Sequence, residues 1–395
     1  MNIHLTTIQT MALAVLVFYL GKFLNNRISF LKENCIPDAV TGGTIFSIIT
    51  LIGHETGTFV FMFEDSLKDI FMIAFFTTVG FSASLKLLKK AGLPVLMFLI
   101  SAILLAFLQN VAGVAMAKVL NVNLMIGLAT GSLATTGGPG TAGAFGPIIE
   151  SFNTPGATMV AMATATYALI AGSIIAGPIC KRLIEKRKLI ENRVTYSEFT
   201  GMDEKSTTLT LANVIPTGFQ IIIAMGIGSI ISNILSSLGL VLPPYIGSMF
   251  AASIMRNLAD ETKMFSIDLD VVSVIGSFTL AMFLSMTLMS FKLWELKELA
   301  LPLIIMLIGQ TVLMGVFAYF ITFRLTGKDY DAAVMTGGHC GCGFGTTPKA
   351  LANMEALTEK YLPSPKAFFV IPIVGGLFID FFNAAIITFF INLLK

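Results

Sequence analysis

The stretches TTGGPG at residues 135–140 and TGGHCG at residues 336–341 interrupt two long apolar segments of the chain. Each follows an apolar segment that carries amide side chains, Gln109 and Asn110 in one case and Gln310 in the other. Because glycine disfavours a helix by about 1 kcal/mol per residue relative to alanine, we expect the helix to break at both stretches. Two broken segments at matching positions in two halves of a chain are typical of secondary transporters.

The composition places the chain in a membrane. Of its 395 residues, 55% are hydrophobic and 12% are charged, whereas a soluble domain has about 25% charged residues. So few charges cannot cover a water-facing surface of ordinary size. The net charge of +2 and the absence of a basic run interleaved with aromatic residues argue against nucleic acid as a partner. Four cysteines do not make a disulfide framework.

Ten apolar segments are long enough to predict membrane-spanning helices, since a span needs about 20 mostly apolar residues. The predicted spans are residues 5–24, 37–53, 69–88, 94–119 and 158–180, followed by 211–238, 242–254, 271–291, 302–323 and 367–394. These segments are continuously apolar rather than alternating, so they favour helices over a barrel. No cleavage site follows the first segment, which we expect to be a retained helix.

The glycine-rich segments near residues 125–149 and 332–350 are predicted to be re-entrant hairpins. Since five spans per half is an odd number, the two halves must have opposite orientations in the membrane. The predicted fold class is an all-α polytopic membrane protein with two inverted repeats of five transmembrane helices, each with one hairpin. The predicted domains are residues 1–180, a linker at 181–208 and residues 209–395.

The basic residues predict the orientation of the spans. With the N- and C-termini outside and the central loop in the cytoplasm, most of the 25 lysines and arginines fall on the cytoplasmic side. We therefore expect a multi-pass protein with a cytoplasmic linker. Trp294, beside Lys292 and Glu295, is predicted to anchor the external boundary.

The broken hairpins are the predicted binding region. Freed N–H groups and helix N-termini attract an anion, freed carbonyl groups can ligate a cation, and hydroxyl groups can do either. The alternative for these glycines is close helix packing. The candidate residues are Ser132, Thr135, Thr136, Gly137, Gly138, Gly140 and Thr141 in the first hairpin, and Gly337, Gly338, His339, Gly341, Gly343, Thr346 and Thr347 in the second.

Polar groups inside predicted spans are further candidates. Asp380 lies near the centre of the last span, and Asn383 lies one turn further on the same face. Such a carboxyl could bind a substrate ammonium, ligate sodium or carry a proton; alternatively, it stays neutral between helices. The amides of Gln109, Asn110 and Gln310 could bind ligands or hold helices together. The candidate sodium ligands are Asp380, Asn383, Asn110 and Asp38, although a carboxylate that starts a helix is the simpler interpretation of Asp38.

The positions of the histidine and arginine residues limit the ways in which an anionic substrate could be neutralised. His339 is predicted to be a polar donor in the second hairpin, and its neighbours Cys340 and Cys342 lack the spacing of a zinc site. All the arginines fall in loops or at span ends. An anionic substrate would therefore be neutralised by helix termini, hydroxyl groups and His339. Residues 138–143 match GxGxxG, but no strand precedes them, so they do not predict a dinucleotide site.

Several motifs resemble those of one family of carriers. They are IPDAVTGG at 36–43, FLQNVAG at 107–113, TTGGPGTAG at 135–143, LSMTLMSFKLWEL at 284–296, GKDYDAAV at 327–334, GHCGCGFGTTPKALANM at 338–354 and FIDFFNA at 378–384. With these motifs the chain resembles, essentially from end to end, the bacterial sodium/glutamate symporters of the glutamate:sodium symporter family.

The resemblance implies a homodimer in the bacterial inner membrane that takes up L-glutamate with sodium, through an elevator-like movement of the parts that bear the loops. It implies sodium as the coupling ion and no organic cofactor. The family's GGxG loops correspond to residues 137–140 and, less regularly, 337–341. Pro139 stands where the family's first loop carries a histidine, so any role of that histidine does not carry over.

Other functions remain to be compared with sodium-coupled glutamate symport. A related sodium-coupled carboxylate carrier, or a cation/proton antiporter that uses Asp380, would share the architecture. An intramembrane enzyme is disfavoured because the sequence has no HExxH pair and no nucleophile with an identifiable base. A channel is disfavoured because two opposed hairpins suit alternating access better than a continuous pore.

Overall fold

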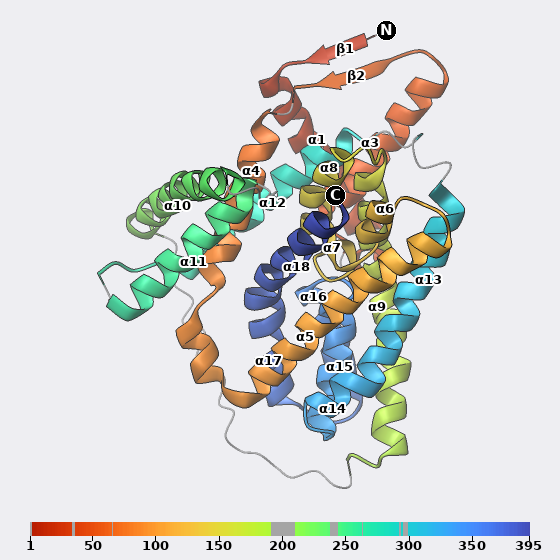
Figure 1. Ribbon diagram of the computed structural model, residues 1–395, viewed down its shortest axis with the longest axis vertical. Helices are drawn as coiled ribbons and strands as arrows, with labels where there is room; N and C mark the ends of the chain where they lie inside the picture. Colours follow the sequence, from red (N-terminus) through yellow and green to blue (C-terminus); the bar gives the residue numbers. More distant parts are fainter. Residues whose placement is uncertain are drawn as a thin grey trace. The chain divides into compact units, whose positions relative to one another are not determined.

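The computed structural model describes residues 2–33, 36–64, 66–190, 210–237, 244–262, 264–291, 294 and 299–395 (Figure 1). Within these ranges, eight helices are long and apolar enough to cross a membrane. The prediction of a helical, polytopic membrane protein is confirmed. Much of the predicted linker, and the predicted anchor residues Lys292 and Glu295, lie outside the described ranges.

The eight helices coincide with eight of the ten predicted spans. They are α1 (Thr7–Arg27), α4 (Ser66–Ser82), α5 (Leu85–Val119), α9 (Ala157–Lys186), α10 (Leu211–Ser237), α12 (Leu269–Met289), α13 (Ala300–Phe317) and the C-terminal run of α17 (Pro365–Ile373), η3 (Val374–Phe378) and α18 (Ile379–Leu394). The other two predicted segments are also helical, as α3 (Asp38–Glu55) and α11 (Pro244–Thr262). The total of ten spans stays a prediction.

A glycine separates two of these spans. The helix α5 has one non-helical residue, Gly92, whose φ of 75° lies in the left-handed region that glycine adopts without steric cost. The chain turns there, and Pro94 lies in the first turn of the helix that follows, where a proline is tolerated. This break divides the apolar stretch into the spans Ser66–Leu87 and Gly92–Val119.

A small parallel sheet was not predicted. Strand β1 (Asn2–Leu5) pairs with β2 (Val60–Phe63), with Asn2 opposite Val60 and Leu5 opposite Phe63. The first helix therefore begins two residues later than predicted, after Thr6. The Thr6 hydroxyl caps this helix and forms a capping box with Gln9.

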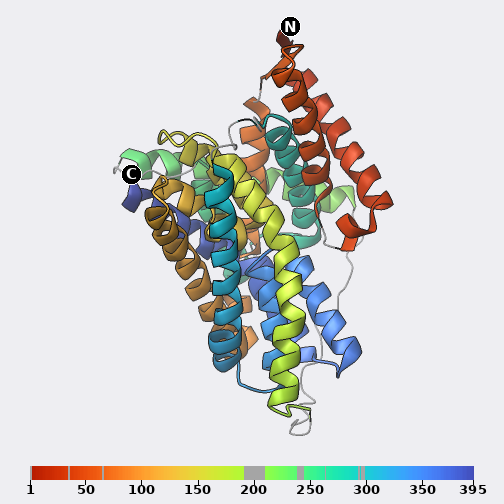
Figure 2. The same cartoon turned by 90° about the vertical axis from the view of Figure 1, so that its right-hand side faces the viewer.

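The chain divides into two compact units that each draw on both halves of the sequence. Unit 1 consists of Met1–Ala83, Ala142–Met162 and Thr207–Leu301. It contains α1, α3 and α4 from the first half and α10, α11 and α12 from the second. Helices α10, α11 and α4 pack one against the next (Figure 1), and α1 lies along α3 (Figure 2).

Unit 2 consists of Ser84–Thr141, Ala163–Ser206 and Pro302–Lys395. It contains α5, most of α9, α13 and the C-terminal run, together with η2 (Ala318–Thr322) and α14 (Phe323–Leu325). It also holds α6 (Leu124–Ala129), α7 (Ser132–Thr135), the start of α8 (Gly138–Glu150), α15 (Tyr330–Cys342) and α16 (Thr347–Lys360). Both glycine-rich stretches therefore belong to unit 2. The helices α5, α15 and α17 are packed together (Figure 1).

Two glycines allow the backbones of α1 and α3 to approach closely. A Cβ atom added at Gly42 would overlap the carbonyl oxygen of Val17, and one added at Gly21 would overlap the carbonyl oxygen of Asp38. Close approach of this kind strengthens the van der Waals packing through which membrane helices associate.

We predict that Gly42→Val separates α1 from α3 and destabilises the protein by roughly 1–3 kcal/mol, the usual range for overpacking. Thermal unfolding of the purified protein in detergent measures the loss. The control is Gly226→Val in α10, where an added Cβ meets no atom within 4 Å. Equal melting temperatures for the two variants would contradict the proposed contact.

Candidate functional site

The first glycine-rich stretch breaks the chain as predicted. Residues 124–150 form three short helices, α6, α7 and α8, rather than one long helix. The last break lies at residues 136–137, before α8, and Gly138 has a φ of 63°. The backbone therefore turns here at a position where a side chain would be strained. The predicted candidates Gly140 and Thr141 lie in the first turn of α8, whose N-terminus faces the break.

The second stretch breaks at a different place from the one predicted. The run Gly337–Gly341 is helical, because α15 continues to Cys342, and the chain leaves the helix at residues 343–346. The predicted break at Gly337–Gly341 is therefore wrong. These glycines instead allow close packing: a Cβ at Gly341 would overlap Ala350 of α16, and one at Gly338 would lie 2.8 Å from Met354 Sδ.

The two breaks meet inside unit 2. A Cβ atom added at Gly138 would lie 3.0 Å from the carbonyl oxygen of Gly345, so a side chain there would crowd the second break. The hydroxyl group of Thr136 donates a hydrogen bond to the carbonyl oxygen of Gly343, at 3.2 Å. The two glycine-rich stretches therefore meet within one compact unit.

One amide side chain binds both breaks. Gln109 Nε2 donates to the carbonyl oxygen of Gly343 at 2.8 Å, and Gln109 Oε1 accepts a hydrogen bond from the Thr136 hydroxyl at 2.7 Å. Gln310 Nε2 donates to the backbone carbonyl of Gln109 at 2.8 Å. Both glutamine side chains are fully buried. Gln109 therefore links the two breaks through hydrogen bonds, and Gln310 holds the backbone at Gln109.

A second group of amides surrounds Ser132 at the start of α7. Asn110 Oδ1 accepts a hydrogen bond from the Ser132 backbone N–H at 2.8 Å, and Asn383 Nδ2 donates to the Ser132 carbonyl oxygen at 3.0 Å. Three further polar atoms of this group, Asn110 Nδ2, Ser132 Oγ and Asn383 Oδ1, are buried and have no hydrogen-bond partner among the described residues. A buried polar atom without a partner costs about 1–3 kcal/mol, so this group is suited to accept a ligand.

Asp380 lies one turn before Asn383 on the same face of α18. Its side chain is half-buried. The preceding five residues form the π-helical turn η3, and π turns inside α-helices are frequent at functional sites. A Cβ at Gly375, within this turn, would lie 3.1 Å from the Thr347 hydroxyl, so the turn lies close to the start of α16.

The remaining hairpin candidates have local contacts. The hydroxyl group of Thr135 donates to the Gly131 carbonyl oxygen at 2.9 Å, and a Cβ at Gly137 would crowd the Thr141 side chain. Thr346 is the N-cap residue of α16, and Thr347 is the first residue of that helix. The two threonines therefore mark the N-terminus of the helix that follows the second break.

His339 lies within α15, one turn before the second break. Its Nδ1 atom is 2.8 Å from the Thr322 hydroxyl oxygen, which also accepts a hydrogen bond from the Ser101 hydroxyl at 3.2 Å. The rings of Phe98 and Phe317 pack against the imidazole edge to face. The structure thus places His339 in a fully buried, largely aromatic environment.

Asp38 belongs to unit 1. It is the first residue of α3, and its carboxylate accepts a hydrogen bond from Asn25 Nδ2 at 2.7 Å. The Thr41 hydroxyl donates to Asn25 Oδ1 at 2.7 Å. These hydrogen bonds join the start of α3 to Asn25 of α1, within unit 1.

Lys349 is the residue of this region that the sequence pattern did not identify. It falls within the predicted second hairpin and was counted only among the basic residues of the cytoplasmic side, but it lies in the first turn of α16 and is only 3% exposed. A buried side-chain amino group therefore lies directly after the second break, at the start of α16. Its position in TTPK, just beyond the glycines, was the available signal.

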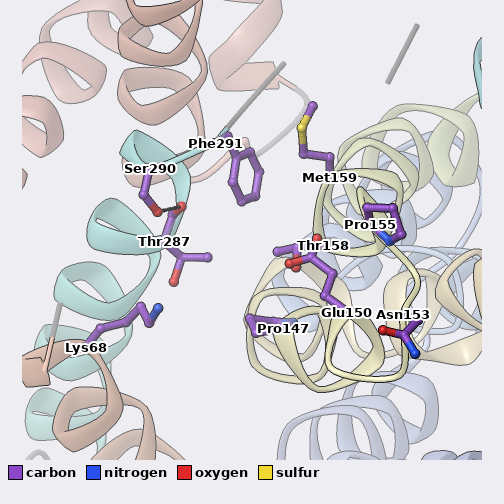
Figure 3. A pocket seen from close by; sticks show the side chains of 10 residues that line it. All are labelled: Lys68, Pro147, Glu150, Asn153, Pro155, Thr158, Met159, Thr287, Ser290 and Phe291. Carbon is purple, nitrogen blue, oxygen red and sulfur yellow. Dashed lines mark hydrogen bonds between the residues drawn. The ribbon is translucent and has the colours of Figure 1, made fainter. Parts of the chain in front are cut away.

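Unit 1 contains a separate polar cavity of about 470 Å³. Lys68, Thr287 and Ser290 line one side, and Glu150 and Thr158 line the other (Figure 3). Glu150 Oε1 accepts a hydrogen bond from the Thr158 backbone N–H at 2.9 Å, so this carboxylate caps the start of α9. The opposite charges of Lys68 and Glu150 make this cavity polar on both sides.

Comparison with known proteins identifies the family. A sequence profile described as sodium/glutamate symporter matches residues 3–363. The chain belongs to the sodium/glutamate symporter family. The sodium/glutamate symporter of Haemophilus influenzae is 40% identical over 394 residues, which cover 98% of this chain and 97% of that protein. The sodium/glutamate symporter of Escherichia coli is 38% identical over 398 residues, covering 99% and 98%. The resemblance inferred from the motifs is confirmed.

Among solved structures, a sodium proton antiporter from Methanocaldococcus jannaschii aligns over 98% of both chains with a TM-score of 0.44 and 15% identity. A likeness at this level does not establish a shared fold.

Proposed function

We propose that this member of the sodium/glutamate symporter family takes up L-glutamate together with sodium, and that unit 2 binds both. Two relatives at about 40% identity over nearly the whole chain are named sodium/glutamate symporters. The observation within the structure that carries the proposal is the buried, incompletely bonded group around Ser132. The chain is therefore a carrier driven by an ion gradient.

The group around Ser132 supports a sodium site. Hard cations such as sodium prefer oxygen ligands. Ser132 Oγ and Asn383 Oδ1 are oxygen atoms buried without a partner among the residues described, and both belong to the broken first hairpin and the helix beside it. Asp380, one turn away on α18, supplies the negative charge that balances the ion. Asn110 positions Ser132 through the Ser132 backbone N–H.

The helix N-termini at the two breaks support a site for the glutamate carboxylates. The helices α8 and α16 both begin at a break, and each N-terminus offers unpaired N–H groups and a partial positive charge. Lys349, buried in the first turn of α16, would add its side-chain amino group as a hydrogen-bond donor at this site. None of the arginines of the described ranges, Arg27, Arg182, Arg187, Arg256 and Arg324, lies in α8, α15 or α16, the helices at the two breaks. Helix termini and Lys349 therefore replace the arginine clamp that anionic ligands commonly meet.

The segments that make up the two units support an architecture of two inverted repeats with re-entrant hairpins. Unit 1 takes the first three apolar spans of each half together with residues 142–162, and unit 2 takes the later spans of each half with both glycine-rich stretches. Such a division, in which the early spans of both halves form one unit and the late spans form the other, is expected of two related repeats. We propose that unit 2 moves relative to unit 1 during transport, and that the carrier is a homodimer of the bacterial inner membrane with both termini outside.

Reconstituted protein tests the function directly. We expect proteoliposomes to accumulate radiolabelled L-glutamate when an inward sodium gradient is imposed, and to lose this accumulation when potassium replaces sodium at a fixed proton gradient. Accumulation driven by protons alone would instead favour a cation/proton mechanism. Equal uptake of dicarboxylates that lack an amino group would favour the related carboxylate carrier.

The sodium site is tested with Asn383→Ala. Removal of one oxygen ligand should raise the sodium concentration for half-maximal uptake about tenfold, since a hydrogen bond or contact to a charged group contributes about 1.5–3 kcal/mol. The matched control is Asn392→Ala on the same helix, where the amide donates to the Thr388 carbonyl. An unchanged sodium dependence of Asn383→Ala would exclude this residue as a ligand.

Lys349 is tested by measuring substrate affinity. We expect Lys349→Gln to raise the KM for glutamate by about tenfold, because a hydrogen bond from a buried amino group to a carboxylate contributes about 1.5–3 kcal/mol. The sodium concentration for half-maximal uptake should stay unchanged at saturating glutamate. Lys360→Gln, at the exposed end of the same helix, is the control. An unaltered KM in a well-folded Lys349→Gln protein would remove Lys349 from the substrate site.

A further inference from the structure

A second cavity in unit 2 opens between two membrane-spanning helices. It has a volume of about 660 Å³ and lies between the C-terminal part of α9 and the C-terminal part of α13 with η2. These two helices run side by side and end at the same end of the unit (Figure 2). We call this cavity the α9–α13 groove. Its lining residues are Pro178, Ile179, Arg182, Lys186, Val312, Gly315, Val316, Tyr319 and Phe320.

Most of the groove is apolar. Val312, Val316 and Phe320 follow one another at four-residue intervals along one face and are 58%, 51% and 48% exposed. Gly315 leaves the centre of the groove open, since a Cβ there would find only Ile179 Cδ1 within 4 Å, at 3.7 Å. An exposed apolar face on a spanning helix is expected to contact lipid chains.

One end of the groove is positively charged. Arg182 and Lys186 lie one turn apart at the exposed end of α9. Arg324 approaches from the other helix, with its guanidinium carbon 5.9 Å from the centre of the Phe320 ring. No carboxylate forms an ion pair with Arg182 or Lys186 in the part of the chain that the structure describes. The nearby Glu185 instead accepts a hydrogen bond from the Tyr361 hydroxyl at 3.1 Å.

We propose that the α9–α13 groove binds one anionic phospholipid of the cytoplasmic leaflet. The acyl chain would lie along Val312, Val316 and Phe320, and the phosphate would lie between Arg182 and Lys186. Basic pockets between spanning helices on the cytoplasmic side are suited to acidic headgroups, and a basic residue near the surface contributes about 1 kcal/mol to that attraction. The groove is positively charged at one end and apolar along the rest of its length. An anionic phospholipid has a matching arrangement, with a negative headgroup at one end and apolar chains at the other.

This assignment differs from the transport site in both position and chemistry. The groove shares no lining residue with the group around Ser132 or with the N-termini of α8 and α16. Lipid binding can therefore be measured without transport, and its failure would leave the proposed symport untouched. The two basic residues are also ones that no step of glutamate binding uses.

Native mass spectrometry of delipidated protein in detergent tests the proposal with phosphatidylglycerol as the probe. We expect wild-type protein to retain phosphatidylglycerol in preference to phosphatidylcholine with the same acyl chains. The variant Arg182→Gln/Lys186→Gln should bind phosphatidylglycerol about 30-fold more weakly, the loss expected for two such charges. Glycerol 3-phosphate, which has the phosphate but no chains, should not displace the lipid.

The matched control is Lys181→Gln/Lys328→Asn, which removes two positive charges from residues outside the groove. Asparagine is used at position 328 because Lys328 has a φ of 61°, a conformation that asparagine adopts readily. This control should bind phosphatidylglycerol like the wild type, and Gly315→Leu, which fills the groove, should bind it weakly. Equal binding by the two double variants would overturn the proposal. So would a disulfide between two copies of Val316→Cys, since a second chain would then cover the groove.

Discussion

A backbone that leaves its helix inside a membrane must find hydrogen-bond partners within the protein, because hydrocarbon offers none. This requirement governs unit 2. The carbonyl of Gly343, freed where α15 ends, receives hydrogen bonds from Gln109 and from Thr136. The backbone of Ser132, at the other break, is bonded through its N–H to Asn110 and through its carbonyl to Asn383. These bonds account for three amide side chains in otherwise apolar helices, and for Thr136 in the break between α7 and α8.

The helical architecture could be predicted because continuous apolar segments of about 20 residues have few other structures available in a membrane. The break at Gly138 was predictable for a similar reason, since several glycines and a proline follow in close succession. The second glycine run was misplaced because glycine has two uses that look alike in a sequence. At Gly338 and Gly341 it allows α16 to approach α15, and the residues that reveal this, Met354 and Ala350, are more than eight positions away.

Contacts between residues distant in the sequence explain the other features that the sequence did not predict. Lys349 counts as a cytoplasmic charge when residues are sorted by sequence position, yet the fold of α16 buries it. The pairing of β1 with β2 joins segments that lie far apart in the sequence, and four-residue strands carry too little pattern to predict such pairing.

Of the four candidate sodium ligands, Asn110 and Asn383 both contact Ser132, Asp380 lies one turn from Asn383, and Asp38 starts a helix in unit 1.

The bonds of Gln109 have a consequence for the fidelity of a coupled carrier. Because one side chain holds both Thr136 and the Gly343 carbonyl, the two breaks cannot drift apart without rupturing its hydrogen bonds. An ion bound beside Ser132 and a solute bound between the two helix N-termini would then keep a constant spacing throughout a cycle. A constant spacing of this kind opposes uncoupled transport, in which the ion crosses the membrane without the solute.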